Sequence, residues 1–499
     1  MHTRTRTLRT STAICVVLAA TAALSPTALA GPATAEQATG TTRADFNGDG
    51  VADTAAAASL ATVGRQERAG YVAVTYGNST KALKDQTRRV YSQNTPGVPG
   101  SAERDDTFGS TLTAADLDGD SFTDLVVGTP GEAVGDTDNQ AGTLTVLWGA
   151  KGGLTGGTVI KGAPFERLGV ALTAGDFDGD GHRDLATGTT VAYGPFGRTT
   201  GPAHTAAMDA RVGGNPEEVW NPPVLAAGDV NGDGLDDVVA VISHGEDELP
   251  YHGPRLVNWF PGSAHGLSTG QTLRDAATGQ TIDGGRDVAV GDLDRDGHAD
   301  IVLGRPGDED MQGTDDVNAV GGAVEIVRGG PSGPDTTVPG IRFDQDTVGV
   351  PGTGEYGDDW GGLVCLGDVD GDGRLDLAVG APGEDVGSAA DAGAVTLLHG
   401  SPSGITASGA KTFTQNSTSV PGTAERSDTF GAAVHLADTT GDGRAELWIG
   451  APGENNPAGG VWVLKGASPV PTGTGSATFG PPALGLGTTA SHLGSGFDR

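Results

Sequence analysis

The sequence contains few cysteines and few aromatic residues. Two cysteines occur in 499 residues, and aromatic residues make up 5%. Cys15 lies in an apolar N-terminal stretch and Cys365 in the segment "GLVCLGDVD". Removal of the N-terminal stretch would leave one thiol, which excludes an intramolecular disulfide. The apolar neighbours of Cys365 favour a buried structural thiol over a reactive nucleophile.

Positive charge is also scarce. The chain has 30 lysines and arginines against 64 aspartates and glutamates, a net charge of −34. This balance opposes binding to nucleic acids and to anionic lipid surfaces. Outside the N-terminal stretch there is no apolar run of the ~18 residues that a membrane helix needs, so we expect no membrane insertion.

The N-terminus has the features of a signal peptide. Arg4, Arg6 and Arg9 precede the apolar stretch Ala13–Leu24, and small residues at Ala28 and Ala30 supply a cleavage site. Cleavage after Ala35 is the alternative. We therefore expect a secreted, extracellular protein with a signal peptide at residues 1–30, a short linker at 31–41 and a folded domain at 42–499.

Glycine and aspartate are abundant, and they recur together. With 85 glycines and 28 prolines, the composition favours short strands joined by tight turns over a helix-rich fold. A nine-residue motif recurs at intervals of 53 to 76 residues. Its seven copies are "DFNGDGVAD" at Asp45, "DLDGDSFTD" at Asp116, "DFDGDGHRD" at Asp176, "DVNGDGLDD" at Asp229, "DLDRDGHAD" at Asp292, "DVDGDGRLD" at Asp368 and "DTTGDGRAE" at Asp438.

The residues around the motif predict about four short strands in each unit. Eight residues before the first aspartate, the better-preserved units have an aromatic or apolar residue followed by glycine, as in Phe108-Gly109 and Trp360-Gly361. After the motif come an apolar run, a turn such as "GAPGE", and a second apolar run. Such a unit cannot bury both faces alone, so neighbouring units must stack. The sequence therefore predicts an all-β, seven-bladed β-propeller of four-stranded antiparallel blades.

The chain ends predict how the ring closes. The segment His492–Arg499 resembles the opening of a unit, with Leu493-Gly494 in place of Phe108-Gly109, and it stops before any aspartate motif. The first motif, in turn, lacks such an opening. We expect the C-terminal strand to pair into the first blade; an open superhelix is the alternative.

The motif also predicts metal binding. Positions 1, 3, 5 and 9 mostly carry Asp or Asn oxygens, and position 7 would offer its backbone carbonyl, a ligand set suited to Ca²⁺. Up to seven structural calcium ions are expected. The predicted ligands are Asp45, Asn47, Asp49, Val51, Asp53; Asp116, Asp118, Asp120, Phe122, Asp124; Asp176, Asp178, Asp180, His182, Asp184; Asp229, Asn231, Asp233, Leu235, Asp237; Asp292, Asp294, Asp296, His298, Asp300; Asp368, Asp370, Asp372, Arg374, Asp376; Asp438, Thr440, Asp442, Arg444, Glu446.

The motif shares features with two other structures. An EF-hand loop shares its start but needs a glutamate at position 12 and flanking helices, and position 12 here is apolar, as at Val127. An Asx/Gly turn without metal could explain a single copy. Copies that depart from the pattern are expected to bind more weakly: Ser121 replaces glycine in one, and Thr440 and Glu446 replace aspartates in another.

Together, the Phe-Gly pair, the aspartate loop and the Gly-Ala-Pro turn resemble FG-GAP repeats. The sequence from about residue 42 to 499 is similar to the seven-bladed β-propeller at the N-terminus of integrin α subunits and in many exported bacterial proteins. This resemblance implies Ca²⁺ in hairpin loops on one face and ligands on the opposite face. It favours a monomeric binding or adhesion module for an extracellular protein ligand. Integrin α subunits also use a β subunit and further domains for that function, neither of which this sequence contains.

Catalytic motifs are not convincing. The segment Gly266–Gly270 fits the serine-hydrolase elbow pattern, but similar segments at the same place in other units indicate a hairpin turn. His182 and His298 fall at position 7 of the aspartate motif. We therefore identify no catalytic residue and no site for an organic cofactor, and a polysaccharide hydrolase or lyase remains the less favoured alternative.

A lectin-like polysaccharide-binding propeller is the other alternative. Candidate ligand loops are the segments before each Phe-Gly pair (Pro99–Gly109, Pro351–Gly361 and Pro421–Gly431) and the loop "EAVGDTDNQAG". Tyr356 or Trp360 could stack on a sugar, although the place of Trp360 in the repeat favours a core position.

Overall fold

A computed structural model describes residues 44–135, 140–210, 222–243, 255–306, 320–455, 457–487 and 491–499, within the compact unit Ala38–Arg499. The predicted signal peptide and linker lie outside the described residues, as do residues 136–139 of the candidate ligand loop "EAVGDTDNQAG". Within the described residues no helix is long and apolar enough to span a membrane.

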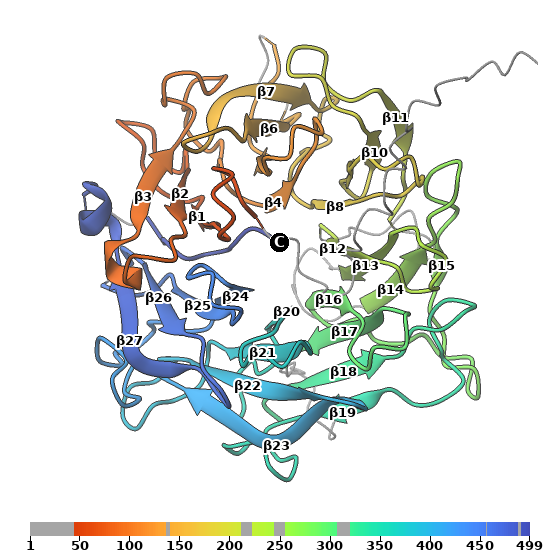
Figure 1. Ribbon diagram of the computed structural model, residues 1–499, viewed down its shortest axis with the longest axis vertical. Helices are drawn as coiled ribbons and strands as arrows, with labels where there is room; N and C mark the ends of the chain where they lie inside the picture. The colour runs from red at the N-terminus through yellow and green to blue at the C-terminus, as the bar shows by residue number, and fades with distance from the viewer. Residues whose placement is uncertain are drawn as a thin grey trace, which may run out of the picture. The chain divides into compact units, whose positions relative to one another are not determined.

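The strands form seven antiparallel sheets arranged in a ring (Figure 1). Blade 1 contains β1 (Thr54–Ala58), β2 (Tyr71–Tyr76) and β3 (Thr87–Tyr91), and blade 2 contains β4 (Leu112–Ala115), β5 (Asp124–Thr129), β6 (Thr143–Trp148) and β7 (Thr155–Lys161). Blade 3 contains β8 (Thr173–Gly175), β9 (Asp184–Ala186), β10 (Thr190–Tyr193) and β11 (His204–Ala207), and blade 4 contains β12 (Val224–Gly228), β13 (Asp237–Ser243), β14 (Arg255–Phe260) and β15 (Gln271–Thr272). Blade 5 contains β16 (Asp287–Gly291), β17 (Asp300–Arg305), β18 (Ala323–Val327) and β19 (Ile341–Phe343), and blade 6 contains β20 (Leu363–Gly367), β21 (Asp376–Ala381), β22 (Ala394–Ser401) and β23 (Gly404–Phe413). Blade 7 contains β24 (Ala433–Ala437), β25 (Glu446–Ala451), β26 (Gly460–Lys465) and β27 (Thr472–Phe479), and two short 3₁₀ helices are η2 (Leu83–Asp85) and η3 (Pro481–Leu484).

The chain runs outward within each blade. In blades 2 to 7 the first strand lies nearest the ring centre and the fourth at the rim (Figure 1). Successive inner strands from β4 to β24 contact one another. The second strands are deeply buried: every residue of β5, β21 and β25 is buried. A second strand covered on both faces reads as a continuous apolar run, which is why the sequence identifies these strands well.

Apolar side chains fill the spaces between adjacent blades. One cluster joins Val72 and Val74 of blade 1 to Leu112 and Val127 of blade 2. Phe108, Trp360 and Phe430 are the aromatic residues that precede the conserved glycine, and all three are fully buried. The prediction of a core position for Trp360 is therefore confirmed. Burial of each such side chain contributes about 1.5–3 kcal/mol, so stacking of blades, rather than any single blade, supplies the stability.

The C-terminal segment completes blade 1, as predicted. Phe497 pairs antiparallel with Ala56 of β1. Ala57 N–H donates to Gly496 C=O at 2.8 Å, and Asp498 N–H donates to Ala55 C=O at 3.1 Å. Phe497 also belongs to an apolar cluster that contains residues of blades 1 and 7. The ring is therefore closed by a strand that lies between β1 and the centre, where Figure 1 places the C-terminus.

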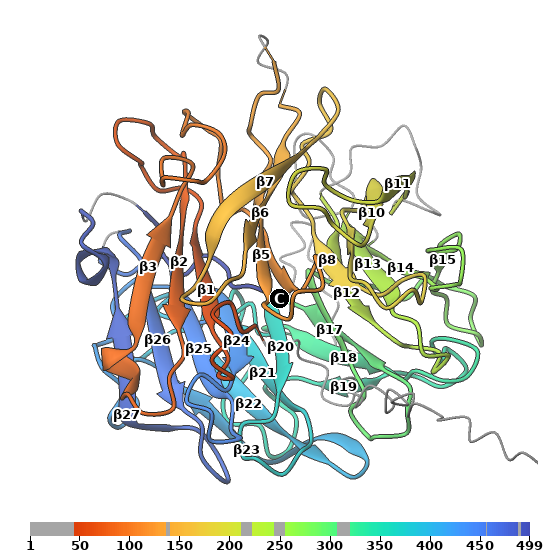
Figure 2. The same cartoon turned by 45° about the horizontal axis from the view of Figure 1, so that its top comes forward.

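The antiparallel order gives the ring two distinct faces. The connection between the first and second strands of a blade lies at the same end as the connection between the third and fourth. We call this end the motif face, because the aspartate motifs lie there. The turns between second and third strands and the connections between blades lie at the other end, which we call the opposite face. The tilted view in Figure 2 shows both ends of the blades.

Candidate metal centres

Each aspartate motif forms a loop that wraps around its own first carboxylate. In blade 2, Asp116 Oδ1 accepts hydrogen bonds from Gly119 N–H at 2.8 Å and Asp120 N–H at 3.2 Å. Asp116 Oδ2 accepts another from Ser121 N–H at 2.9 Å. The loop that begins at Asp45 repeats this pattern, and the loop at Asp368 keeps the bonds from Gly371 and Gly373, while Asp372 N–H donates to Asp370 Oδ1 instead. The backbone N–H groups therefore fix the carboxylate at the centre of the turn.

The ninth residue of the motif ties the loop to the blade. Asp124 is the first residue of β5 and is fully buried. Its Oδ2 accepts Leu117 N–H at 3.0 Å, and its Oδ1 accepts Gly149 N–H, just beyond β6, at 2.7 Å. The same two bonds occur at Asp53, Asp184, Asp237, Asp300 and Asp376. This carboxylate is thus both a candidate ligand and a structural link.

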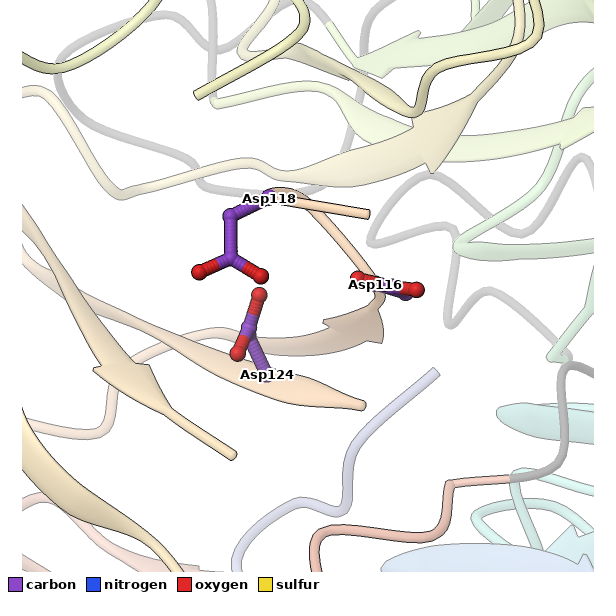
Figure 3. Close-up of side chains that lie close together, drawn as sticks. All are labelled: Asp116, Asp118 and Asp124. Carbon is purple, nitrogen blue, oxygen red and sulfur yellow. The ribbon is translucent and has the colours of Figure 1, made fainter. Parts of the chain in front are cut away.

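Five loops bring three carboxylates together, with one oxygen of each within 4.8 Å of the others. In the best-aligned cases these are positions 1, 3 and 9 of the motif. Figure 3 shows one of them, where the carboxylates of Asp118 and Asp124 face each other and Asp116 lies beside them. The five groups are Asp116, Asp118, Asp124; Asp176, Asp178, Asp184; Asp292, Asp294, Asp296; Asp368, Asp370, Asp376; and Asp438, Asp442, Glu446.

In the two remaining loops position 3 is an asparagine. Asn231 Nδ2 donates to Asp233 Oδ2 at 3.0 Å, and Asn47 Nδ2 lies 3.4 Å from Asp53 Oδ1. In the loop at Asp438, Thr440 Oγ1 donates to Glu446 Oε1 at 3.1 Å. Because a neutral Asn or Thr replaces an aspartate at position 3, these loops carry one negative charge fewer there.

Position 5 turns away from the carboxylate cluster in most loops. Asp120 Oδ1, for example, accepts Phe122 N–H at 3.0 Å, and Asp180, Asp233 and Asp372 accept the corresponding bond. Asp296 and Asp442 make this bond as well, and both also belong to a three-carboxylate cluster. The predicted ligands at position 5 are therefore close to the loop backbone.

Side chains at position 7 pack on the preceding blade. A Cβ added to Gly48, which has φ of 70°, would lie 2.4 Å from Phe122 Cε1 of the next loop. Leu235 covers Gly179 in the same way, and Val51 of blade 1 lies over Gly441 of blade 7. In these three loops glycine at position 4 suits both the left-handed backbone and the space that the neighbouring side chain leaves, whereas Arg295 occupies position 4 in blade 5 with φ of 64°.

Burial makes several of these carboxylates hard to ionise without a counter-charge. Desolvation raises the pKa of Asp124 and of Asp184 to about 7, and that of Asp53 to about 8, against the lowering effect of their backbone hydrogen bonds. Nearby motif aspartates raise these pKa values further. A bound cation would remove this penalty.

Two orphaned oxygens fit a cation. Asp118 Oδ1 and Asp294 Oδ1 are buried and have no hydrogen-bond partner. Both belong to three-carboxylate clusters. A buried carboxylate oxygen without a partner is costly, and a hard cation with oxygen ligands would satisfy it. The donor sets of these loops can therefore hold a metal ion.

Basic side chains also reach the loops, which the sequence did not suggest. Arg198 forms ion pairs with Asp118 and Asp120, Arg328 NH1 lies 3.3 Å from Asp294 Oδ2, and Lys465 Nζ lies 3.6 Å from Asp442 Oδ2. Each of these side chains follows a third strand and so lies on the motif face. No sequence signal could have identified Arg198, which is 80 residues from Asp118.

Titratable side chains in the central channel hold the ring together. Arg499 forms a two-armed ion pair with Asp287 of β16, at 2.5 and 2.8 Å. Asp498 Oδ1 accepts Ala55 N–H, and the His435 ring stacks near Phe497 with centroids 5.9 Å apart. Cys365 lies on the inner strand β20 and is partly rather than fully buried; desolvation raises its pKa to about 11, which opposes a reactive thiolate. Ser268 lies in the connection between β14 and β15, so the elbow pattern is a strand-to-strand connection.

The opposite face exposes two aromatic side chains. Phe165 is 76% exposed and Tyr356 is 59% exposed, each in a connection between blades. Trp360, in contrast, donates from Nε1 to Thr396 Oγ1 at 3.2 Å in the core. Of the aromatic residues considered as sugar platforms, only Tyr356 is therefore accessible.

Comparison with known proteins agrees with this architecture. The FG-GAP repeat family model matches residues 108–147, 168–203, 360–398 and 430–464. The chain is 31% identical over 263 residues to integrin alpha pat-2 of Caenorhabditis briggsae, an alignment that covers 50% of this chain and 19% of that protein. It is 30% identical over 226 residues to integrin alpha-PS2 of Drosophila melanogaster (44% and 15%). It is 31% identical over 164 residues to phosphatidylinositol-glycan-specific phospholipase D of Mus musculus (32% and 17%). The chain thus spans less than a fifth of the length of each of these relatives.

Proposed function

Because the chain carries FG-GAP repeats on a seven-bladed propeller and is homologous to part of the integrin α subunits, we propose that it is a secreted, calcium-stabilised binding module for an extracellular protein. The observation that supports binding most directly is the separation of the two faces. The motif face is occupied by the acidic loops, which leaves the connections of the opposite face free for a ligand. On this proposal the domain spans residues 42–499.

Calcium is the ion that these loops favour. Their ligand groups are carboxylate, amide and carbonyl oxygens, and several carboxylates approach one another on tight turns. Ca²⁺ accepts such irregular oxygen sets more readily than Mg²⁺, which demands near-octahedral geometry. The predicted ligands at the first, third and ninth positions would hold the ion, and the backbone carbonyl at the seventh would complete the set. Loops with Asn47, Asn231 or Thr440 at the third position would bind more weakly.

Binding is tested with the full chain in calcium against an array of extracellular protein domains. We expect selective binding that is lost when loops of the opposite face are altered, for example by Tyr356→Ser combined with Phe165→Ser. Lys151→Ser is the matched control, because Lys151 is exposed on the motif face. Equal loss of binding in the control, or no selective protein partner at all, would contradict the proposal.

A lectin-like function is the second candidate, and the exposure of Tyr356 favours it. An exposed aromatic ring beside acidic side chains is a common sugar platform. The same protein on a glycan array distinguishes the two candidates. Calcium-dependent glycan hits that Tyr356→Ser abolishes would favour polysaccharide binding over a protein ligand.

Secretion is tested separately. The protein is expected in the culture medium with a new N-terminus at Gly31, or at Glu36 if cleavage follows Ala35. Mass spectrometry of the secreted protein identifies the cleavage site. Retention of Met1 in a cytosolic protein would contradict the assignment.

A further inference from the structure

Arg198 occupies an unusual place between two blades. It lies in the connection between β10 and β11 of blade 3, on a turn closed by Gly197 N–H to Gly201 C=O at 2.8 Å. From there it reaches the acidic loop of blade 2. The guanidinium carbon lies 5.3 Å from the centre of the Trp148 ring, a cation–π contact that holds the side chain in position.

The arginine binds two of the candidate metal ligands. Its Nε donates to Asp118 Oδ2, and its NH2 donates to Asp120 Oδ2 at 2.6 Å. These aspartates stand at the third and fifth positions of the motif. Asp118 Oδ1, the other oxygen of the same carboxylate, is the buried oxygen without a partner. The guanidinium therefore neutralises charge at Asp118 Oδ2, on one side of the Asp118 carboxylate. Asp118 also belongs to the three-carboxylate cluster with Asp116 and Asp124.

Another loop of the same chain provides an internal comparison. The loop at Asp176 has the same aspartates at positions 1, 3, 5 and 9, and its carboxylates form the same cluster. Among the residues that the structure describes, no ion pair involves Asp178 or Asp180. The loop at Asp292 is intermediate, because Arg328 contacts Asp294 Oδ2 at 3.3 Å with one nitrogen.

We propose that Arg198 is a tethered cation that competes with calcium at the Asp116 loop and sets a lower affinity there than at the Asp176 loop. This inference rests on the proposed calcium binding. A fixed positive charge a few Å from the site repels a divalent ion, and calcium affinity in oxygen sites follows the net charge of the ligands. The chain therefore carries calcium sites of graded affinity, in the order Asp176, Asp292 and Asp116.

The test is the Arg198→Gln variant of the full chain, with terbium as a luminescent probe for the calcium sites. Trp148 lies directly under the guanidinium, so it reports on the Asp116 loop, and Trp148→Phe identifies its share of the emission. Arg68→Gln is the matched control. It removes an arginine outside the motifs that pairs with Asp105, which is not a candidate ligand, at 2.5 Å.

We expect Arg198→Gln to tighten terbium binding at the Trp148-sensitised site by about tenfold, and calcium to compete correspondingly better. Arg68→Gln should leave this affinity unchanged. Unchanged or weaker binding in Arg198→Gln would overturn the proposal, because the arginine would then orient the ligands. If the folded wild type binds no metal at all, both the Arg198 proposal and the proposed calcium binding fail. Metal binding that Arg198→Gln does not tighten overturns the Arg198 proposal alone.

Discussion

At the scale of single residues, Ser121 shows how one substitution in a repeat stores strain. It has φ of 72° at the sixth position of its motif, where the other six copies have glycine. A left-handed backbone costs a non-glycine residue about 1–2 kcal/mol. The loop nevertheless keeps the hydrogen bond from Ser121 N–H to Asp116 Oδ2.

We therefore expect Ser121→Gly to stabilise the protein by about 1 kcal/mol. The greater conformational entropy of glycine in the unfolded chain reduces this gain. Chemical denaturation in calcium measures the change. Ser121→Ala is the control, because it removes the hydroxyl and keeps the strain. Destabilisation by the glycine variant would show that the serine side chain, rather than the backbone, decides the stability of this loop.

His435 makes the stability depend on pH. It lines the central channel on β24, near Phe497, Arg499 and Cys365. Burial, together with the positive charge of Arg499, lowers its pKa to about 4, against about 6.5 in an unfolded chain. The folded state therefore disfavours the protonated ring. The stability that depends on the neutral ring is fully present above pH 6.5 and is lost as the pH falls towards 4.

The prediction is that His435→Gln removes part of this pH dependence. Between pH 6.5 and 4 in saturating calcium, wild type should lose on the order of 2 kcal/mol more stability than the variant. Denaturant titrations at several pH values give the free energy of unfolding of both proteins. The contributions of the other titrating groups largely cancel in the difference between wild type and variant. Parallel curves for the two proteins would contradict a buried neutral histidine.

At the scale of the structural element, the ninth residue of each motif has a role that does not need metal. Asp124 joins the loop to the end of β6 through two buried backbone N–H groups, whereas Asp120 makes a local bond within the exposed part of the loop. Removal of a buried acceptor leaves its donors unsatisfied, at about 1–3 kcal/mol each.

In excess chelator, Asp124→Ala should therefore lose about 2–4 kcal/mol of stability and Asp120→Ala less than about 1 kcal/mol. In calcium, both variants should lose additional stability if both aspartates contribute to metal binding. Urea unfolding with and without chelator separates the two contributions. Equal losses in chelator would mean that Asp124 acts through the metal alone.

Most elements of this fold could be predicted from the sequence, because the repeat supplied seven aligned copies of the same signals. The second strands of the better-preserved units, the buried aromatic residues before the conserved glycine, and the pairing of the C-terminal segment with β1 were expected, and the structure confirms them. Strands β8 and β9, of three residues each, carry too few apolar positions for such a prediction.

The contacts between blades could not be predicted. Arg198 on Asp118, and Arg499 on Asp287, join residues that are 80 and 212 positions apart. Long flexible side chains can reach any of several carboxylates, and the choice depends on the geometry of packed blades.

At the scale of the whole molecule, the acidic loops make stability depend on cations. Carboxylates about 4 Å apart repel by about 4 kcal/mol at an effective dielectric constant of 20. A ligand at 100 times its dissociation constant adds about 2.7 kcal/mol per site. Several occupied loops would therefore contribute a large part of the total stability.

We expect chelation to lower the melting temperature by more than about 10 °C, and added calcium to restore it. Differential scanning calorimetry at constant ionic strength measures the shift. Magnesium at the same concentration is the control, and should restore much less. An unchanged melt in excess chelator would contradict the calcium assignment for the set of loops.

Closure of the ring joins distant parts of the chain. Ala55 N–H and Asp498 Oδ1, which bond at 2.8 Å, are 443 positions apart. During synthesis, the segment around Phe497 emerges from the ribosome after all seven motifs. Until then, blade 1 has an unpaired inner edge at β1, and an open strand edge of this kind can pair with other chains. The order of translation therefore makes the first blade the last of the seven to be completed, and the nascent chain is open to misassembly until the segment around Phe497 appears.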